Sequence, residues 1–418
     1  MHELAPELKK IVAQVDQEIT PRLAQIDEQV LYNQAKVLKA FQDQHVAESD
    51  LTGSTGYGHN DEGRQKLDAI YAQVFKTEAA LVRSQFVSGT HTLAVALAGN
   101  LHYGDHLTYL TGEPYDTMQE VIGIAGNQKG SLREAGVSFS YVPLTPSGEV
   151  DDVQAEIVLK RDHPKIIVIQ RSRGYATRPS FTVAKIQRMI TLIKKVSPES
   201  LIFIDNCYGE FSECHEPTEY GADFMAGSLI KNAGGGIAKT GGYIVGRKDL
   251  VENAAYRLTA AGIGDSEGAS LANNHEFYQG FFEAPEVTGN AIKGAIYSAA
   301  LLQKMGLKVS PTWDEPRTDL IQTIIFNDRQ NMIKFTQQIQ ANSPVDSFVE
   351  PIPSKMPGYE DEIIMAAGSF VQGATMEFSA DGPLRPPYAL YMQGGLTYAH
   401  VKLAITQAVQ ATFFADKE

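Results

Sequence analysis

The sequence predicts an α/β protein built on a mostly parallel sheet wrapped by helices, with an N-terminal helical arm and a smaller C-terminal α+β domain. Two observations predict the sheet. From about residue 80 to residue 250, short apolar segments typical of buried strands alternate with amphipathic segments typical of helices. Polar side chains follow several of the apolar segments, and the carboxyl ends of strands form the ligand crevice of such a sheet.

Residues 1–50 are expected to form the helical arm. Apolar side chains recur at helical spacing from Leu8 to Phe41. Pro21 is expected to separate two helices, because a proline is well tolerated in the first turn of a helix. We expect the arm to pack on its own domain or on a partner subunit rather than to carry chemistry.

Residues 51–294 are expected to form the large α/β domain. Its first part is polar and glycine-rich and contains Tyr57, His59 and Arg64. This part is either a surface connector or a loop that reaches an active site, in this chain or in a neighbouring one. Apolar runs predict strands at 106–110, 137–142, 165–170 and 201–205, and amphipathic periodicity predicts helices at 65–75 and 183–196.

Small and hydroxyl-bearing residues, Ser88-Gly89-Thr90, lead directly into an apolar helix. The free N–H groups and the dipole of a helix start form a seat for a phosphate group. The alternative is that Ser88 or Thr90 is an ordinary helix cap. The pattern alone leaves both interpretations open.

Two further side chains fall at the ends of predicted strands. Tyr115 follows the strand 106–110, where its ring is placed to lie flat on another aromatic ring. Asp205 ends the strand 201–205. In a mostly parallel sheet both would lie at the edge where ligands bind.

Lys231 lies at the centre of a glycine-rich segment, residues 221–246, with the pattern of a strand, a turn and a second strand. Small neighbours leave room for a flat aromatic cofactor, and Ser228 offers it a hydroxyl group. A lysine becomes a nucleophile when burial or nearby cations disfavour its charged form. One alternative is a surface lysine. The other is a phosphate loop of the G-x-x-x-x-G-K-[ST] kind, which needs glycine at positions 233 and 238, where this chain has alanine.

Together these side chains are the parts that pyridoxal 5′-phosphate requires. Its aldehyde forms a Schiff base with a lysine, its ring is stacked, its ring nitrogen is kept protonated by a carboxylate, and its phosphate rests on amide donors. The candidate cofactor-binding residues are Lys231, Tyr115, Asp205, Ser88, Gly89, Thr90 and Ser228.

Residues 295–418 are expected to form the small domain, between an apolar helix at 295–305 and a second one at 397–413. Arg385, held between prolines and leucine, is a candidate for a substrate carboxylate because a guanidinium group binds carboxylates bidentately. A second candidate is Arg173, which clusters with Arg171 and Arg178 after the strand 165–170. These arginines alternatively face solvent.

The composition is that of an ordinary globular protein, with 43% hydrophobic residues and a net charge of −14. That acidic balance disfavours nucleic acid as a partner. Two cysteines are too few for a disulfide framework, no Cys/His spacing resembles a metal site, and neither a signal peptide nor a run of about 18 apolar residues is present. We therefore expect a cytoplasmic protein without a metal site or a membrane span.

Six segments together resemble the aspartate-aminotransferase-like superfamily, the pyridoxal-phosphate enzymes of fold type I. They are GYGHNDEGR (56–64), SGTHT (88–92), GDHLTYLTGEPYDT (104–117), FIDNCYGEF (203–211), GSLIKNAGGGIAKTGGYIVG (227–246) and RPPYALYMQGGLTYAH (385–400). Within the superfamily the chain is most similar to the cystathionine and methionine lyases, and among these to bacterial proteins labelled methionine γ-lyase-like or aluminium-resistance proteins. The resemblance covers nearly the whole chain and implies a seven-stranded type of sheet.

The resemblance also implies roles for single residues. Lys231 would be the Schiff-base lysine, Asp205 the partner of the ring nitrogen and Tyr115 the stacking tyrosine. Phosphate ligands would come from Gly89, Thr90 and Ser228. Tyr57 would reach the phosphate of a neighbouring subunit, which implies a homodimer or a dimer of dimers with active sites at the subunit interface.

The chain departs from the well-described lyases at two places. Those enzymes have an arginine two residues after the tyrosine, whereas this chain has His59 there and Arg64 further on. The segment Gln170-Arg171-Ser172-Arg173 also differs from their pattern. These departures leave the role of Arg64 and the substrate preference open.

The expected function is that of a carbon–sulfur lyase that cleaves a sulfur amino acid by α,β- or α,γ-elimination. Lys231 would move the α-proton, and Tyr115 would assist departure of the thiolate. Two alternatives stay open. One is another reaction of the same cofactor, such as transamination or γ-replacement, and the other is a non-catalytic, stress-related protein of the same fold.

Overall fold

A computed structural model describes residues 4–176, 178–355, 361–373 and 375–414. The chain divides into two compact units. The large unit comprises Asn33–Ala284. The small unit combines the residues up to Tyr32 with those from Pro285 onward.

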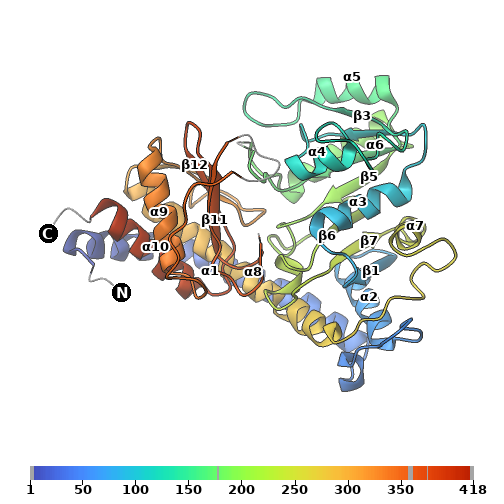
Figure 1. Ribbon diagram of the computed structural model, residues 1–418, viewed down its shortest axis with the longest axis horizontal. Helices are drawn as coiled ribbons and strands as arrows, with labels where there is room; N and C mark the ends of the chain where they lie inside the picture. The colour runs from blue at the N-terminus through green and yellow to red at the C-terminus, as the bar shows by residue number, and fades with distance from the viewer. Residues whose placement is uncertain (1–3, 177, 356–360, 374, 415–418) are drawn as a thin grey trace. The chain divides into compact units, whose positions relative to one another are not determined.

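The large unit is built on a seven-stranded sheet, as expected (Figure 1). Its strands lie in the order β1-β7-β6-β5-β4-β2-β3. Strand β7 is antiparallel to β1 and β6, and the other neighbouring pairs are parallel, so the expectation of a mostly parallel sheet is confirmed. The strands are β1 (Ala79–Arg83), β2 (His106–Tyr109), β3 (Ser138–Tyr141), β4 (Ile166–Gln170), β5 (Leu201–Asp205), β6 (Phe224–Ser228) and β7 (Gly242–Gly246).

Helices cover both faces of this sheet. Successive strand residues point to opposite faces, so Ile167 and Ile169 belong to one apolar core and Ile166 and Val168 to the other. The first core is completed by α2 (Glu62–Val74), α5 (Asp152–Asp162) and α6 (Val183–Val196), and the second by α3 (Gly89–Asn100), α4 (Asp116–Ile122) and α7 (Lys248–Leu258). Short 3₁₀ helices are η1 (Glu48–Leu51), η2 (Pro217–Tyr220) and η3 (Asn232–Gly234).

The N-terminal arm is one helix, α1 (Pro6–Asp43), with Pro21 inside it. The expected break at Pro21 is therefore wrong. A proline inside a helix costs about 3 kcal/mol because it removes one backbone hydrogen bond and crowds the preceding turn. Val15, Ile19 and Ile26 are buried on both sides of the proline, and burial of each such side chain contributes about 1.5–3 kcal/mol. The continuous apolar stripe therefore outweighs the cost of the proline.

The small unit contains a five-stranded antiparallel sheet in the order β10-β11-β12-β9-β8. Its strands are β8 (Lys308–Ser310), β9 (Gln322–Ile325), β10 (Ile363–Ala366), β11 (Ser379–Pro383) and β12 (Ala389–Gln393). Helices α9 (Arg329–Ala341) and α10 (Tyr398–Phe413) belong to this unit. The apolar helix expected at 295–305 is the last part of a longer helix, α8 (Asn273–Lys304), which begins in the large unit.

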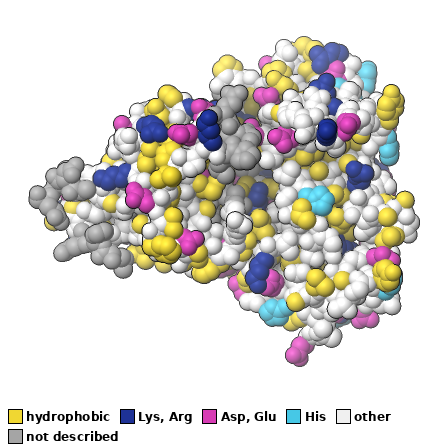
Figure 2. Space-filling model, in the orientation of Figure 1, with side chains coloured by type: hydrophobic (Ala, Val, Ile, Leu, Met, Phe, Trp, Pro, Cys, Tyr) yellow, Lys and Arg dark blue, Asp and Glu magenta, His cyan; other side chains and the backbone are white. Residues whose placement is uncertain are grey.

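Acidic and basic side chains are interspersed over the face drawn in Figure 2 rather than gathered by sign. Among the described helices, none is both long enough and apolar enough to cross a membrane.

Candidate active site

Two parallel strands bring Lys231 and Asp205 to the same edge of the large sheet. Strands β5 and β6 are paired so that Asp205 lies opposite Ala226. Strand β6 ends two residues later at Ser228, and Lys231 follows directly before η3. Because the carboxyl ends of parallel neighbours meet at one edge, the carboxyl group and the amine share a site.

The Lys231 amine is surrounded by acidic groups. Its Nζ lies 4.0 Å from the centre of the Tyr208 ring. Burial lowers the pKa of this amine, but Cys207, Tyr208 and Asp205 together raise it by more, so the net pKa lies above the usual range of a lysine. Without a cofactor, the amine therefore carries its proton.

Asp205 is buried at the end of β5, with 5% of its surface exposed. Its Oδ1 accepts a hydrogen bond of 3.1 Å from the backbone N–H of Cys207. Burial raises the pKa of this carboxyl group, and the nearby charge of Lys231 opposes the rise. A second cationic group in contact with the carboxylate would lower the pKa further.

The start of α3 lies against Ser228. Ser88 caps this helix, accepting a 3.0 Å hydrogen bond from the N–H of His91. A side-chain carbon built on Gly89 would lie 3.3 Å from Cβ of Ser228 and 3.6 Å from Sγ of Cys207. The Ser228 hydroxyl is fully buried and has no hydrogen-bond partner among the described residues. A buried hydroxyl without a partner at a helix start fits an anionic ligand.

Tyr115 directly precedes α4 and is half-buried against the core beneath α3 and α4. Burial, and then the nearby Asp205 and Cys207, raise the pKa of its phenol well above the ordinary value, while a hydrogen bond with Thr90 opposes the rise. The Thr90 hydroxyl also lies 3.0 Å from that of Thr117. The predicted residues Tyr115, Thr90 and Asp205 thus lie in one neighbourhood.

The three arginines after β4 are all buried, so the alternative of solvent-facing side chains is wrong. Arg171 donates to Asn206 Oδ1 at 2.8 Å and forms ion pairs of 3.1 Å with Glu213 and 3.2 Å with Glu216. Its backbone N–H also donates to the carbonyl of Asp205. Arg171 therefore holds the segment that follows β5.

Arg178 has a different partner set from Arg171. It donates to the backbone carbonyls of Gln170 and Ser172, at 3.0 and 2.7 Å, and lies over the ring of Phe181. It stabilises its own loop. The side chain of Arg173 is 3% exposed, and its backbone N–H donates to Ser180 Oγ.

The loop that contains Tyr57 is fixed by Arg64. The Arg64 guanidinium group is buried and donates to the carbonyls of Gly268 and Asp265. Arg64 ties residues 56–64 to the segment 265–268. The arginine at this position, which differs from the pattern of the well-described lyases, therefore has a structural role. Tyr57 itself is 70% exposed, and its ring lies beside that of His59.

The family model described as methionine gamma-lyase matches residues 8–413. The chain belongs to this family. The protein YnbB of Bacillus subtilis is 50% identical over 406 residues, which are 97% of this chain and 96% of that protein.

Solved structures agree with the family. A structure from Listeria monocytogenes, provisionally named a cystathionine beta-lyase involved in aluminium resistance, has a TM-score of 0.95 at 53% identity and covers 97% of this chain and 100% of its own. A carbon–sulfur lyase involved in aluminium resistance from Clostridium novyi has a TM-score of 0.93 at 44% identity, covering 97% and 96%. The pyridoxal-5′-phosphate-dependent YhfS of Escherichia coli shares the fold, with a TM-score of 0.63 at 15% identity.

As a member of the methionine gamma-lyase family, the protein has pyridoxal 5′-phosphate as its cofactor. The residues of the large unit are suited to bind this cofactor. The Ser228 hydroxyl is buried without a partner in the described part of the chain, next to the free N–H groups that begin α3. A phosphate group would satisfy both, and Asp205 and Lys231 lie at the same edge of the sheet, where a ring nitrogen and an aldehyde would find a carboxyl group and an amine.

The other substrate candidate, Arg385, belongs to the small unit. Its side chain is 63% exposed, and its guanidinium group forms a 3.0 Å ion pair with Asp361. Its assignment to a substrate carboxylate, like that of Arg173, stays a prediction.

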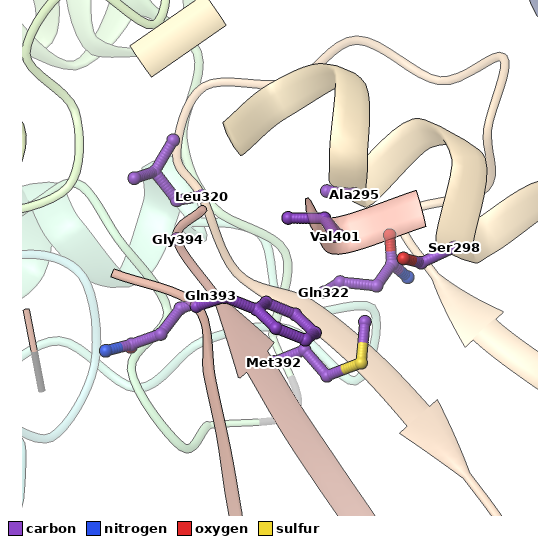
Figure 3. A pocket seen from close by; sticks show the side chains of 9 residues that line it. Ala295, Ser298, Leu320, Gln322, Met392, Gln393, Gly394 and Val401 are labelled. Carbon is purple, nitrogen blue, oxygen red and sulfur yellow. The ribbon is translucent and has the colours of Figure 1, made fainter. Parts of the chain in front are cut away.

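The small unit also contains a small, half-open pocket (Figure 3). No acidic or basic side chain lines it, and none of its lining residues was predicted as a site residue. The lining residues are Ala295, Ser298, Leu320, Gln322, Phe378, Met392, Gln393, Gly394 and Val401. The pocket thus offers no charged group for acid–base chemistry.

Sequence reasoning missed three residues around Lys231. Cys207, Tyr208 and Glu210 all influence its amine, and they follow Asp205 within five residues. Their position directly after a strand that ends in an acid was a usable signal. The directions of their side chains could not be predicted from the sequence, because Tyr208 adopts the left-handed conformation, with φ of 69°.

Proposed function

We propose that the protein cleaves the carbon–sulfur bond of a sulfur amino acid by α,β- or α,γ-elimination, with Lys231, Asp205 and Tyr115 as its principal site residues. The observation that carries this proposal is the meeting of the Lys231 amine, the Asp205 carboxyl group and the start of α3 at one edge of the sheet. The family match supports it.

The bound cofactor would supply an electron sink for the bond that breaks at the substrate's α-carbon. Asp205 would keep the ring nitrogen protonated, because a buried carboxylate is stabilised by an adjacent cation. Lys231 would hold the cofactor and, once released by the substrate's amine, accept the α-proton at Nζ.

Tyr115 is suited to donate a proton to the departing sulfur. Burial and the nearby Asp205 hold the pKa of its phenol above the ordinary value, so the phenol keeps its proton at neutral pH. Its ring, packed beneath α3, would stack on the cofactor. Gly89, Thr90, Ser88 and Ser228 would bind the phosphate.

The substrate carboxylate is assigned to Arg385, with Arg173 as the second candidate. The two are separated by the substitutions Arg385→Gln and Arg173→Gln, with KM measured for one substrate. The variant that loses the carboxylate contact should show the larger rise in KM, because a bidentate pair contributes about 1.5–3 kcal/mol. An unchanged KM in both variants would contradict both assignments.

A second copy of the chain would complete the site. Tyr57 is 70% exposed on a loop that Arg64 fixes in place, so its hydroxyl is available to a neighbouring subunit. We propose a homodimer or a dimer of dimers, located in the cytoplasm. Sedimentation analysis of the wild type, together with cofactor affinity in Tyr57→Phe, tests the shared site.

The reaction itself is tested with the purified protein and its cofactor. Methionine, cystathionine, homocysteine and cysteine are added singly, and thiol, ammonia and keto acid are each measured, with Lys231→Ala as the control. Elimination predicts equal amounts of thiol or other sulfur product, ammonia and keto acid in the wild type and none in the control. Amino transfer without release of sulfur would contradict the proposal.

A further inference from the structure

Glu210 lies behind β6, on the side of the strand opposite Ser228. Successive residues of a strand point to opposite faces, and a side-chain carbon on Gly227 would collide with Glu210 Oε1. The Glu210 side chain is fully buried, with 0% of its surface exposed. A carboxyl group in such a place needs partners for both of its oxygens.

Only one carboxyl oxygen of Glu210 has a donor within the described residues. The Tyr243 hydroxyl donates to Oε1 at 2.7 Å, while Oε2 has no partner. Asn232, which follows Lys231, donates its Nδ2 to the backbone carbonyl of Glu210 at 2.9 Å. Its own Oδ1 is likewise buried without a donor in the described ranges. Two acceptors that lack a donor thus belong to residues already joined by a hydrogen bond.

One proton would satisfy both acceptors. We propose that Glu210 is a neutral carboxylic acid that donates a hydrogen bond from Oε2 to Oδ1 of Asn232 and so acts as a positioning residue for the turn that carries Lys231. A carboxylate at this place would leave two buried acceptors without a donor, which is costly in a low-dielectric interior. In the protonated acid, the single O–H group gives both oxygens a hydrogen bond.

The groups that face Glu210 are compatible with the neutral acid. They are Tyr243 from β7, Tyr71 from α2, Glu216 and Cys207 from the segment after β5, and Lys231. Glu216 is already paired with Arg171, and among these five groups only Lys231 is a cation. Burial, aided by the nearby Glu216, raises the pKa of Glu210 to about 8, against the opposing effects of the Tyr243 hydroxyl, of its own backbone N–H and of Lys231.

The inference predicts a specific infrared signal. A neutral carboxylic acid has a carbonyl band that a carboxylate lacks, so a difference spectrum of the cofactor-loaded wild type and Glu210→Gln at pH 6 should contain that band. Asp381→Asn is the matched control, because burial also raises the pKa of Asp381, to about 7. Asp381→Asn should lose the carbonyl band of Asp381 and keep that of Glu210. The proposal would be overturned if Glu210→Gln kept every acid carbonyl band and lost a carboxylate band instead.

The positioning role has its own readout, which rests on the proposed cofactor. In Glu210→Gln the amide can donate to Asn232 and accept from Tyr243, so the visible cofactor band should keep the pH profile of the wild type below pH 8. In Glu210→Met, which can do neither, the midpoint of that profile should shift. Equal behaviour of the two variants would refute a positioning role.

The protonation of Glu210 can be tested even if a variant does not fold or the protein does not bind the cofactor. If Glu210→Gln does not fold, the wild type alone is titrated from pH 6 to 9, and an acid carbonyl band must be lost with a midpoint near 8. If no cofactor binds, the proposed function fails, but the infrared test of Glu210 still applies to the cofactor-free protein.

Discussion

The amine of Lys231 lies over the ring of Tyr208, 4.0 Å from its centre. Tyr208 is buried and adopts a left-handed backbone conformation that a tyrosine rarely tolerates outside constrained sites. The face of an aromatic ring attracts a cation. We infer that the strained turn holds the ring where it orients the amine.

That relationship predicts the behaviour of two variants. Tyr208→Leu should weaken the binding of the cofactor by about 3- to 30-fold, the equivalent of a lost cation–ring contact. Tyr208→Phe keeps the ring face and should stay close to the wild type. Equilibrium titration of the cofactor by its visible band measures both, and a similar loss in both variants would assign the effect to the hydroxyl group.

Ser228 provides a test of the phosphate seat. Ser228→Ala should weaken cofactor binding by about 10- to 100-fold, because a hydrogen bond to a charged group contributes about 1.5–3 kcal/mol, and should leave the fold intact. The control is Ser138→Ala on the edge strand β3. Equal affinities of Ser228→Ala and the control would show that the buried hydroxyl does not meet the phosphate.

Arg171 should contribute to stability rather than to substrate binding. Arg171→Met leaves the fully buried Glu216 without its cation, so the free energy of unfolding should fall by about 3–5 kcal/mol. Arg188→Met, which removes an exposed 3.9 Å pair with Asp152, should change it by less than about 0.5 kcal/mol. Chemical denaturation compares the two, and similar losses would be inconsistent with a buried network.

Asp381 predicts a dependence of stability on pH. Burial raises the pKa of its carboxyl group from 3.8 to about 7 in the folded protein. Between these values the unfolded chain releases the proton while the folded chain keeps it, so this residue makes stability fall as pH rises from about 4 to 7. Asp381→Asn should remove that part of the fall, whereas the exposed control Glu350→Gln should not. Thermal unfolding across this range measures both.

Most helices and strands could be predicted from the sequence, because each depends on a local pattern of apolar residues. Strand β5 and helix α6 begin and end where the apolar run and the periodicity predicted. The continuity of α1 through Pro21 could not be predicted, because it depends on the burial of Val15 and Ile26 by residues distant in the chain.

The site followed only in part. That Asp205, Ser228 and Lys231 lie at one edge of the sheet could be predicted, because parallel strands place their carboxyl ends together, whereas their roles stay predictions. The contact of Tyr208 with the lysine depends on a left-handed turn that no periodicity reveals. Arg64 was equally hidden, since its carbonyl partners lie about two hundred residues further along the chain.

The most direct test of the account is to locate the covalent attachment of the cofactor. The protein is loaded with pyridoxal 5′-phosphate, reduced with borohydride, digested and analysed by mass spectrometry. We predict that the reduced cofactor is found on Lys231 and that Lys231→Ala loses both this adduct and the visible band. An adduct on a different lysine, or a wild type that forms none with excess cofactor, would contradict the assignment.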